Sequence, residues 1–391
     1  MMLAIVLVCF YCCSESSRGK YAHLFYLHTR TESFSDMSDD TATLESMGIA
    51  NNGQIIQMLT SEERQVEGVK LPEFLKRSFG AHMTIDEMVS RQTRIERQEN
   101  PVCSSASFDM HAANMFQSYI QSAIAFSIKR GGILYGHVDE DKNVFIHAIY
   151  EPPQQGSQDS LILERETPQE KLADRIATIW GWKKVGWVFS QSTKERDFMF
   201  SAEEVAQMAA IQDEMGECAV TAVVALLPAD GPDEVPEVHF EAFQVSKQCV
   251  QLQKEGWFKE TPDSTNIVKV INPKDPKDKT PVIVARKDVD EIDADYFLVP
   301  VGIKDHEGVA MNSFAIENRL LPQGPSELKA HLNKYSAMPF SERLKDFHLM
   351  LYLADKAGFT PEDIDSISAA AISGDPIPEG YQMIINGVAG M

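Results

Sequence analysis

The stretch Lys184-Val185-Gly186-Trp187-Val188-Phe189-Ser190-Gln191 is short, largely apolar and bounded by polar residues, which predicts a buried strand. A capping box with proline at the first helical position, Thr167-Pro168-Gln169-Glu170, opens a helix before it. The apolar run Ala219–Leu227 predicts a second buried strand, and Glu237–Val245 alternates like a strand with one solvated face. The order of elements over residues 107–245 therefore predicts an α+β fold.

The same stretch resembles the strand that carries the zinc site in JAMM metalloproteases of the MPN fold, which reads roughly V-G-W-Y-H-S-H in active members. Phe189 and Gln191 stand where the two zinc-binding histidines would be. A neutral imidazole offers zinc a nitrogen lone pair, whereas Phe has no ligand atom and Gln offers only an amide oxygen. The resemblance implies that the fold is kept, that the zinc site is lost, and that Phe189 fills the vacated space.

The other two positions of a JAMM site also depart from its pattern. Glu204 stands where the metal-binding Asp would be, and Lys129 falls at the position of the catalytic Glu, counted back from Gly136. Ser201 and Glu204 have a complete structural explanation as a helix capping box. A hydrolytic zinc site needs three protein ligands. We therefore expect no catalytic residue, no metal and no other cofactor, and an active zinc deubiquitinase is the weakest alternative.

Composition argues against two classes of partner. The 391 residues carry a formal net charge of −22, whereas sequence-independent binding to nucleic acid needs clustered Lys and Arg. The same charge argues against attachment to an anionic membrane surface. Of the six cysteines, only Cys9 and Cys12 have C-x-x-C spacing, and the three beyond residue 13 lie far apart. A zinc ribbon needs two such pairs, so neither a zinc ribbon nor a disulfide framework is indicated, and a reducing compartment is expected.

The N-terminal run MMLAIVLVCFYCC, residues 1–13, is too short to span a bilayer, so no stable membrane insertion is expected. It resembles the apolar core of a signal peptide but lacks a preceding positive charge. The run has three interpretations: a genuine signal, an unusual cytosolic start, or a mis-assembled reading frame. The sequence favours the last.

Residues 1–43 are expected to be unstructured, because the part after the apolar run is rich in Ser, Thr and Asp and has no clear periodicity. A turn and then a strand at Ile55–Leu59 are predicted within residues 44–60. This range resembles the closing strands of a ubiquitin-like domain whose first half is missing. Such a fragment would expose unpaired strand edges and would be poorly stable alone.

Residues 61–106 are expected to be a charged linker that contains a helix over Ile85–Glu99. Arg91, Arg94 and Arg97 follow one another at intervals of three residues, which would place the three cations on one face of that helix. A solvated helix face is favoured over a specific anion site.

An amphipathic helix is predicted from Phe108, at the start of the expected inactive MPN domain. Cys103 lies near the start of that helix, whose dipole could lower its pKa, but no His or Lys partner is evident and an inert thiol is expected. His137 and His147 fall on strands that are predicted to be neighbours. A metal site is one interpretation, but without a third ligand a structural role is favoured.

The pattern changes beyond Ser246. A Pro- and charge-rich loop is followed by predicted strands at Val282–Ala285 and Phe297–Ile303, and Pro339 precedes a predicted helix. Residues 246–391 are therefore expected to form a separate C-terminal α+β domain that packs on the first.

Several stretches together resemble the plant-type branch of the nuclear protein localization protein 4 family. They are Leu71–Phe74, Arg130–Gly136, Ile149–Gly156, Lys184–Trp187, Val238–Gln244 and Lys254–Phe258. The resemblance runs from about Leu44 to the C-terminus and keeps order and spacing. It implies an inactive MPN domain followed by the C-terminal domain of that family.

The resemblance also implies a function. Family members work with a ubiquitin-fusion-degradation partner protein as adaptors for a hexameric AAA ATPase, the ubiquitin-selective segregase. They bind polyubiquitin and help to start its unfolding, for example when proteins leave the endoplasmic reticulum (ER) for proteasomal degradation. The resemblance thus implies a cytoplasmic and nuclear adaptor that is recruited to the ER surface. A scaffold MPN subunit of a larger lid-like complex is the alternative.

The chain departs from the family pattern in two places. Fungal and animal members carry zinc-finger modules before the MPN domain, and only Cys103 remains of such cysteines here. The ubiquitin-like domain that grips the ATPase in the family is expected to be truncated here, so ATPase binding is expected to be weak. The loop of Glu151, Pro152, Pro153 and Gln154 is interpreted either as a partner surface, stiffened by its prolines, or as a structural turn.

Overall fold

The structure, a computed structural model, describes residues 21–28, 33–36, 56–60, 93–192, 198–227, 237–259, 265–273, 282–285 and 287–391. The chain divides into two compact units, Met1–Ile85 and Asp86–Met391. Among the helices that the structure describes, none combines the length and the apolar character needed to cross a bilayer.

The first unit contains a three-stranded antiparallel sheet of order β2-β1-β3. Its strands are β1 (Tyr21–His28), β2 (Ser33–Asp36) and β3 (Ile56–Thr60). β3 confirms the strand predicted at Ile55–Leu59, whereas the turn predicted before it lies outside the described residues. β1 and β2 show that residues 1–43 are not wholly unstructured. The β1 sequence is rich in aromatic and aliphatic residues, which favour strands, and the Ser-rich surroundings obscured it.

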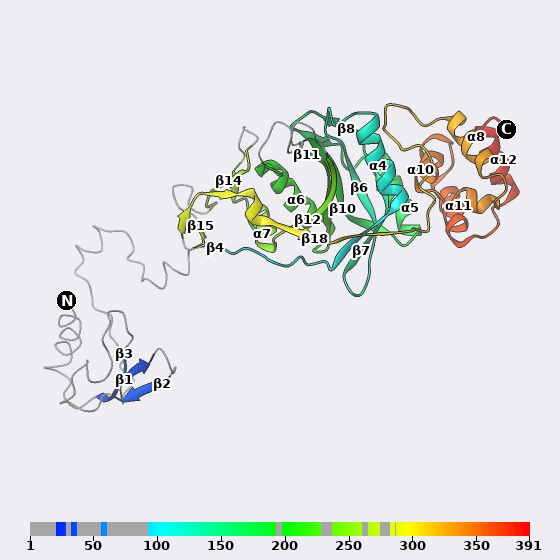
Figure 1. The fold of residues 1–391 in the computed structure, drawn as a ribbon. Coiled ribbons are helices and arrows are strands. Elements are labelled where there is room, and N and C mark those ends of the chain that lie inside the picture. Colours follow the sequence, from blue (N-terminus) through cyan, green and yellow to red (C-terminus); the bar gives the residue numbers. More distant parts are fainter. Residues whose placement is uncertain are drawn as a thin grey trace, which may run out of the picture. The chain divides into compact units, whose positions relative to one another are not determined.

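The second unit is built on an eight-stranded sheet of order β18-β12-β11-β10-β6-β7-β5-β19 (Figure 1). Its strands are β5 (Ser105–Asp109), β6 (Gly131–Val138), β7 (Asn143–Tyr150), β10 (Lys183–Ser192), β11 (Val220–Leu227), β12 (Glu237–Val245), β18 (Leu298–Val301) and β19 (Ile303–His306). β18 pairs with β12 and β19 pairs with β5, yet only Gly302 separates β18 from β19 in the chain. The segment Leu298–His306 therefore joins the two edges of the sheet and closes it on itself.

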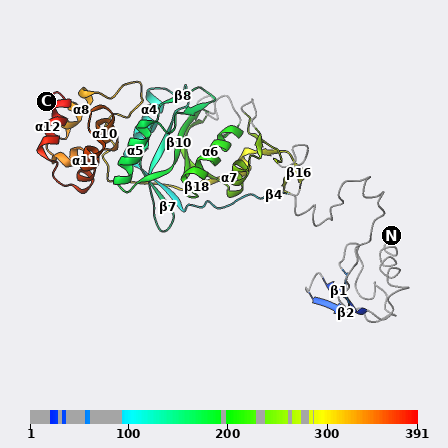
Figure 2. The same ribbon diagram turned by 180° about the vertical axis from the view of Figure 1, so that it is seen from behind.

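Helices cover both faces of this sheet (Figure 1, Figure 2). α4 (Met110–Ser122) packs on one face, in a hydrophobic cluster that includes Val188. α5 (Pro168–Ile179) and α6 (Ala202–Met215) pack on the other face, in a cluster that includes Trp187. Successive residues of a strand point to opposite faces, which is why these two neighbours on β10 enter different clusters.

A glycine positions β10, the strand quoted at the outset. Gly186 has φ of +149°, and a Cβ atom there would lie 1.9 Å from the carbonyl oxygen of Val220 on β11. An irregularity in the pairing of β10 with β6 falls between Lys184 and Gly186. Only glycine tolerates this backbone conformation and this close approach together.

Five helices follow the sheet at the C-terminal end of the chain (Figure 1). They are α8 (Pro325–Lys334), α9 (Phe340–Arg343), α10 (Phe347–Lys356), α11 (Pro361–Ser373) and α12 (Glu379–Val388). α10 and α11 pack against α5. The single helix predicted after Pro339 is in fact α9 and α10. The carboxylate of Asp346 accepts hydrogen bonds from the backbone N–H groups of His348 and Leu349 and so begins a new helix.

Shorter elements complete the second unit. They are β4 (Thr93–Ile95), β8 (Gln154–Gly156), β9 (Leu161–Leu163), α7 (Lys247–Lys254), β13 (Phe258–Lys259), β14 (Ile267–Val270), β15 (Val282–Val284), β16 (Lys287–Val289), β17 (Glu291–Asp293) and the 3-10 helix η1 (Ala294–Phe297). β4 contradicts the helix predicted over Ile85–Glu99, because its residues pair in parallel with β15. That partner lies far downstream, so the local spacing of the arginines does not reveal it.

The α+β prediction is confirmed, but two of its boundaries differ from the structure. α4 begins at Met110 rather than at Phe108, because Phe108 belongs to β5 and the Asp109 side chain caps the helix. The boundary expected between residues 107–245 and 246–391 does not divide the second unit, since β18 and β19 of the C-terminal range close the sheet.

Candidate functional site

The four positions that the comparison with the JAMM strand singled out lie together, although they come from separate parts of the chain. Lys129, just before β6, forms an ion pair with Glu204 on α6. Its ammonium nitrogen lies 5.9 Å from the centre of the Phe189 ring on β10. Gln191 points to the same face of β10 as Phe189, and its side-chain Nε2 donates to the Met199 carbonyl at 2.9 Å.

The ion pair is buried, with 3% of the Lys129 side chain and 9% of the Glu204 side chain exposed. The second carboxylate oxygen of Glu204 accepts a hydrogen bond from the Ser201 backbone N–H at 2.7 Å. The Ser201 hydroxyl in turn accepts one from the Glu204 backbone N–H, so the predicted capping box is confirmed. One carboxylate thus caps α6 and neutralises an ammonium that would be costly to bury alone.

Phe189 occupies the core, as the resemblance implied, and is 1% exposed. Its ring stacks on Trp187, with ring centres 4.7 Å apart, and meets Phe200 edge to face at 6.1 Å. Gln191 is also buried, at 2% exposed. Aromatic volume and a hydrogen-bonded amide therefore stand at the two histidine positions.

Zinc does not fit this set of side chains. The four positions offer a single carboxylate, and its oxygens already bind an ammonium and a backbone N–H. The adjoining cavity, between Lys129, Phe189 and Glu204, has a volume of about 20 Å³, room for roughly one water molecule. Among all residues that the structure describes, no group of three or more His, Cys, Asp or Glu side chains is arranged to hold a metal ion.

The loop proposed as a partner surface is largely internal. Glu151 is fully buried, and its carboxylate forms ion pairs with Arg130 at 2.7 Å and with Arg319. The Gln154 side chain exchanges two hydrogen bonds with the backbone of Gly131, at 2.7 and 2.8 Å. Glu151 and Gln154 thus fix the start of β6, next to Lys129, which favours the structural-turn interpretation.

The same holds for the prolines of the loop. Pro152 is buried, and Pro153 is partly buried. The Pro153 carbonyl accepts a hydrogen bond from the Glu164 backbone N–H at 2.8 Å. Glu151 and Pro152 are both buried, so they cannot form a surface for a partner, and the structural turn is the better interpretation of these two residues.

His137 and His147 lie on adjacent strands, as predicted, and their ring nitrogens Nδ1 and Nε2 are 2.9 Å apart. The structure adds His306 from β19, whose Nε2 lies 3.0 Å from Nδ1 of His147. Sequence reasoning missed this third imidazole, because it follows His147 by 159 positions and no local pattern links them. Cys103 is buried as well, and burial raises the pKa of its thiol to about 12, opposite to the helix-dipole effect.

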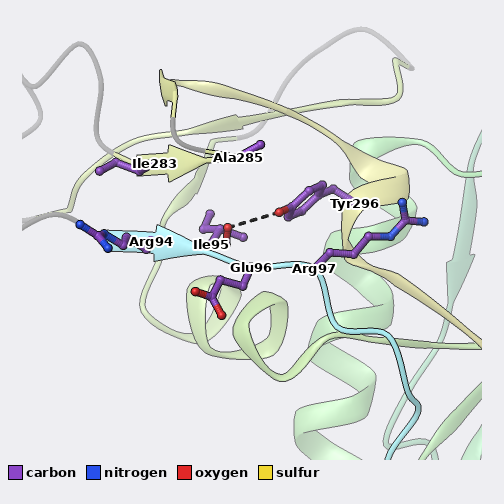
Figure 3. A pocket seen from close by; sticks show the side chains of 7 residues that line it. All are labelled: Arg94, Ile95, Glu96, Arg97, Ile283, Ala285 and Tyr296. Carbon is purple, nitrogen blue, oxygen red and sulfur yellow. Dashed lines mark hydrogen bonds between the residues drawn. The ribbon is translucent and has the colours of Figure 1, made fainter. Parts of the chain in front are cut away.

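The predicted arginine face is not formed. Arg94 belongs to β4, Arg97 follows it in an irregular segment, and Arg91 lies outside the described residues. Arg94 and Arg97 line a cavity of about 560 Å³ together with the 3-10 helix residue Tyr296 (Figure 3). Figure 3 shows the two guanidinium groups pointing away from one another, so they do not converge on a common anion.

Fold and site together define an α+β protein that buries the charged pair Lys129–Glu204 beside strand β10 of its main sheet. A model described as "NPL4 family" matches residues 130–384. The chain belongs to the NPL4 family, which confirms the resemblance drawn from the sequence.

Several relatives are similar over long stretches. "NPL4-like protein 2" of Arabidopsis thaliana is 39% identical over 360 residues, which cover 91% of this chain and 84% of that protein. "NPL4-like protein" of Oryza sativa subsp. japonica is 39% identical over 363 residues, or 90% and 85% of the two chains. The human "Nuclear protein localization protein 4 homolog" is 27% identical over 292 residues, or 62% and 46%. The name of the human relative refers to nuclear protein localization.

Proposed function

We propose that this NPL4-family chain is a non-catalytic adaptor that binds polyubiquitin and delivers ubiquitinated proteins to a hexameric AAA ATPase for unfolding. The observation that carries the proposal is the buried Lys129–Glu204 pair. An ammonium and its counter-charge occupy the place where a metalloprotease of the JAMM type needs a dication and an activated water. An inactive MPN domain that keeps its fold serves binding rather than hydrolysis.

We also propose partners for the adaptor and the compartments in which it works. Family membership supports a ubiquitin-fusion-degradation partner protein as the second component of the adaptor. The names of the animal and Dictyostelium relatives refer to nuclear protein localization, which supports work in the nucleus as well as in the cytoplasm. We further propose recruitment to the ER surface, in support of degradation by the proteasome.

Two rivals lead to different expectations. A zinc deubiquitinase would cleave ubiquitin chains, which the side chains at the four positions oppose. A scaffold MPN subunit of a lid-like complex would share the fold and the lost site but would bind neither free polyubiquitin nor the ATPase. The C-terminal range contains the closing strands of the sheet as well as helices, so it is not the plain terminal helix bundle expected of such a scaffold.

A pull-down with the full chain separates these functions. Immobilised chain is incubated with unanchored polyubiquitin and, separately, with the ATPase hexamer. We expect retention of polyubiquitin without cleavage, and retention of the ATPase that becomes tighter when an intact ubiquitin-like domain is added, because a linked second anchor can raise avidity by roughly 10²–10⁴-fold. Loss of ubiquitin binding with no cleavage would favour the scaffold, and release of monoubiquitin would favour the enzyme.

A matched comparison tests the ATPase arm alone. A version that carries an intact ubiquitin-like domain at its N-terminus should bind the ATPase more tightly than the present chain. Equal, tight binding by both versions would contradict the expectation that a ubiquitin-like domain adds an anchor for the ATPase.

A further inference from the structure

Three imidazoles and a hydroxyl form one continuous chain of polar contacts in the second unit. His137 Nδ1 lies 2.9 Å from His147 Nε2, and His147 Nδ1 lies 3.0 Å from His306 Nε2. His306 Nδ1 in turn lies 2.9 Å from the Ser107 hydroxyl. Each contact has the length of a hydrogen bond. His147 is the middle ring, and both of its nitrogens are used.

This series of contacts between imidazoles runs across the strands at the end of the sheet where β19 pairs with β5. Its members come from β6, β7, β19 and β5, which are neighbours at one end of the strand order. β19 is only four residues long, and through Gly302 it continues the strand that pairs with the opposite edge. β5 lies between β19 and β7, and the contact of His306 with His147 links those two strands across it. The contact therefore holds the closing segment in addition to the backbone hydrogen bonds between β19 and β5.

The contacts limit how many protons the three rings can hold. A neutral imidazole carries one N–H group and one lone-pair nitrogen. Of the six ring nitrogens, four meet in two N···N contacts, and each contact holds one proton. The two remaining nitrogens, His137 Nε2 and His306 Nδ1, hold one each. The intact chain therefore holds at most four protons, one more than three neutral rings carry. A second additional proton would place two N–H groups face to face.

The surroundings disfavour a positive charge on His147, the middle imidazole, whereas nearby carboxylates partly compensate a positive charge on the two outer imidazoles. Burial and, to a smaller extent, the neighbouring imidazoles of His306 and His137 lower the pKa of His147 to about 4, while Asp109 on β5 opposes the shift. Burial also lowers the pKa of His306, against the opposing effect of Asp109 and Asp305. Asp139, in the turn after β6, interacts with His137.

Two aromatic side chains without charge also pack on the imidazoles. The Trp182 ring packs on His147, with ring centres 4.9 Å apart, and Phe145 stacks on His137 at 5.0 Å. Asp109 is itself engaged, since it accepts hydrogen bonds from the Ala112 and Gly308 backbone N–H groups.

We propose that the imidazole chain of His137, His147 and His306 is a proton-sensitive clamp on the closing segment of the sheet. It holds β19 in place while it carries no more than one additional proton, and it releases β19 when a second proton binds. Because the folded state binds protons less readily than the unfolded chain, the clamp is fully effective above the usual histidine pKa of about 6.5 and is lost as the pH falls toward about 4.

Hydrogen exchange of the full chain, read by mass spectrometry at about pH 7.5 and about pH 5, tests the clamp near the usual pKa of histidine. After correction for the intrinsic pH dependence of exchange, protection of the β5 and β19 amides should fall at least about ten-fold more than that of β10 and β11. Equal changes in both regions would overturn the proposal.

Two variants assign the effect to the clamp. His306→Gln supplies a donor and an acceptor but takes no proton, so the extra loss of protection at acid pH should become several-fold smaller, with only His137 and His147 left to titrate. His239→Gln, at a partly exposed position on β12, should keep it. If His306→Gln does not fold at neutral pH, His137→Gln at the other end of the chain replaces it. Retention of the full acid effect in a folded clamp variant would also overturn the proposal.

Discussion

Glu204→Gln is expected to lower the free energy of unfolding by about 3–5 kcal/mol, the cost of leaving one partner of a buried ion pair alone. The substitution isolates the charge, because a glutamine oxygen can still accept the hydrogen bond from Ser201 that caps α6. What remains is the Lys129 ammonium, 3% exposed and without its counter-charge. Chemical denaturation followed by circular dichroism measures the change.

The matched control removes both charges. Lys129→Met keeps the length of the side chain, and the combined variant Lys129→Met/Glu204→Gln should lie within about 1–2 kcal/mol of the natural chain, because a buried pair is often replaced at little net cost. The single variants should therefore not be additive. A Glu204→Gln variant as stable as the natural chain would show that the pair is not closed in solution.

Phe189→Ala is expected to lower the free energy of unfolding by about 3–5 kcal/mol, as for other large-to-small changes in a core. The ring is 1% exposed and packs between Trp187 and Phe200. Removal of the ring leaves a cavity next to the Lys129–Glu204 pair, and water can then reach the pair. The same denaturation experiment measures this loss, and neutrality would mean that β10 is placed wrongly.

Two further variants on nearby elements calibrate that result. Gln191→Ala removes a buried hydrogen bond to Met199 and should cost about 0.5–1.5 kcal/mol, less than the loss of the ring. Ile162→Ala, at a position on β9 that is 62% exposed, should change stability by no more than about 0.5 kcal/mol.

The sequence predicted well those features that depend on local chemistry. The Thr167 and Ser201 caps, the apolar run of β10 and the strand at β3 each follow from a few adjacent residues. The resemblance to the JAMM zinc site places Lys129, Phe189 and Glu204 in one site, and the structure brings them together.

Features that depend on distant partners were missed. Thr93–Ile95 forms a strand only because β15 pairs with it, whereas the arginine spacing around it suggested a helix. The closing segment Leu298–His306 was assigned to a separate domain, since nothing within it shows that it pairs with both edges of one sheet. For the same reason the Lys129–Glu204 ion pair, whose members are 75 positions apart, was not expected as a pair.

We propose that the Lys129–Glu204 pair stands in place of a metal site, and that the protein therefore binds ubiquitin chains rather than hydrolysing them. Elemental analysis of the full chain, purified from cells grown with added zinc, tests it most directly. We expect zinc well below one ion per chain, and a thermal midpoint that a strong chelator leaves unchanged, because a metal bound to the folded state would stabilise it. About one tightly bound zinc per chain, with a midpoint lowered by the chelator, would contradict the account.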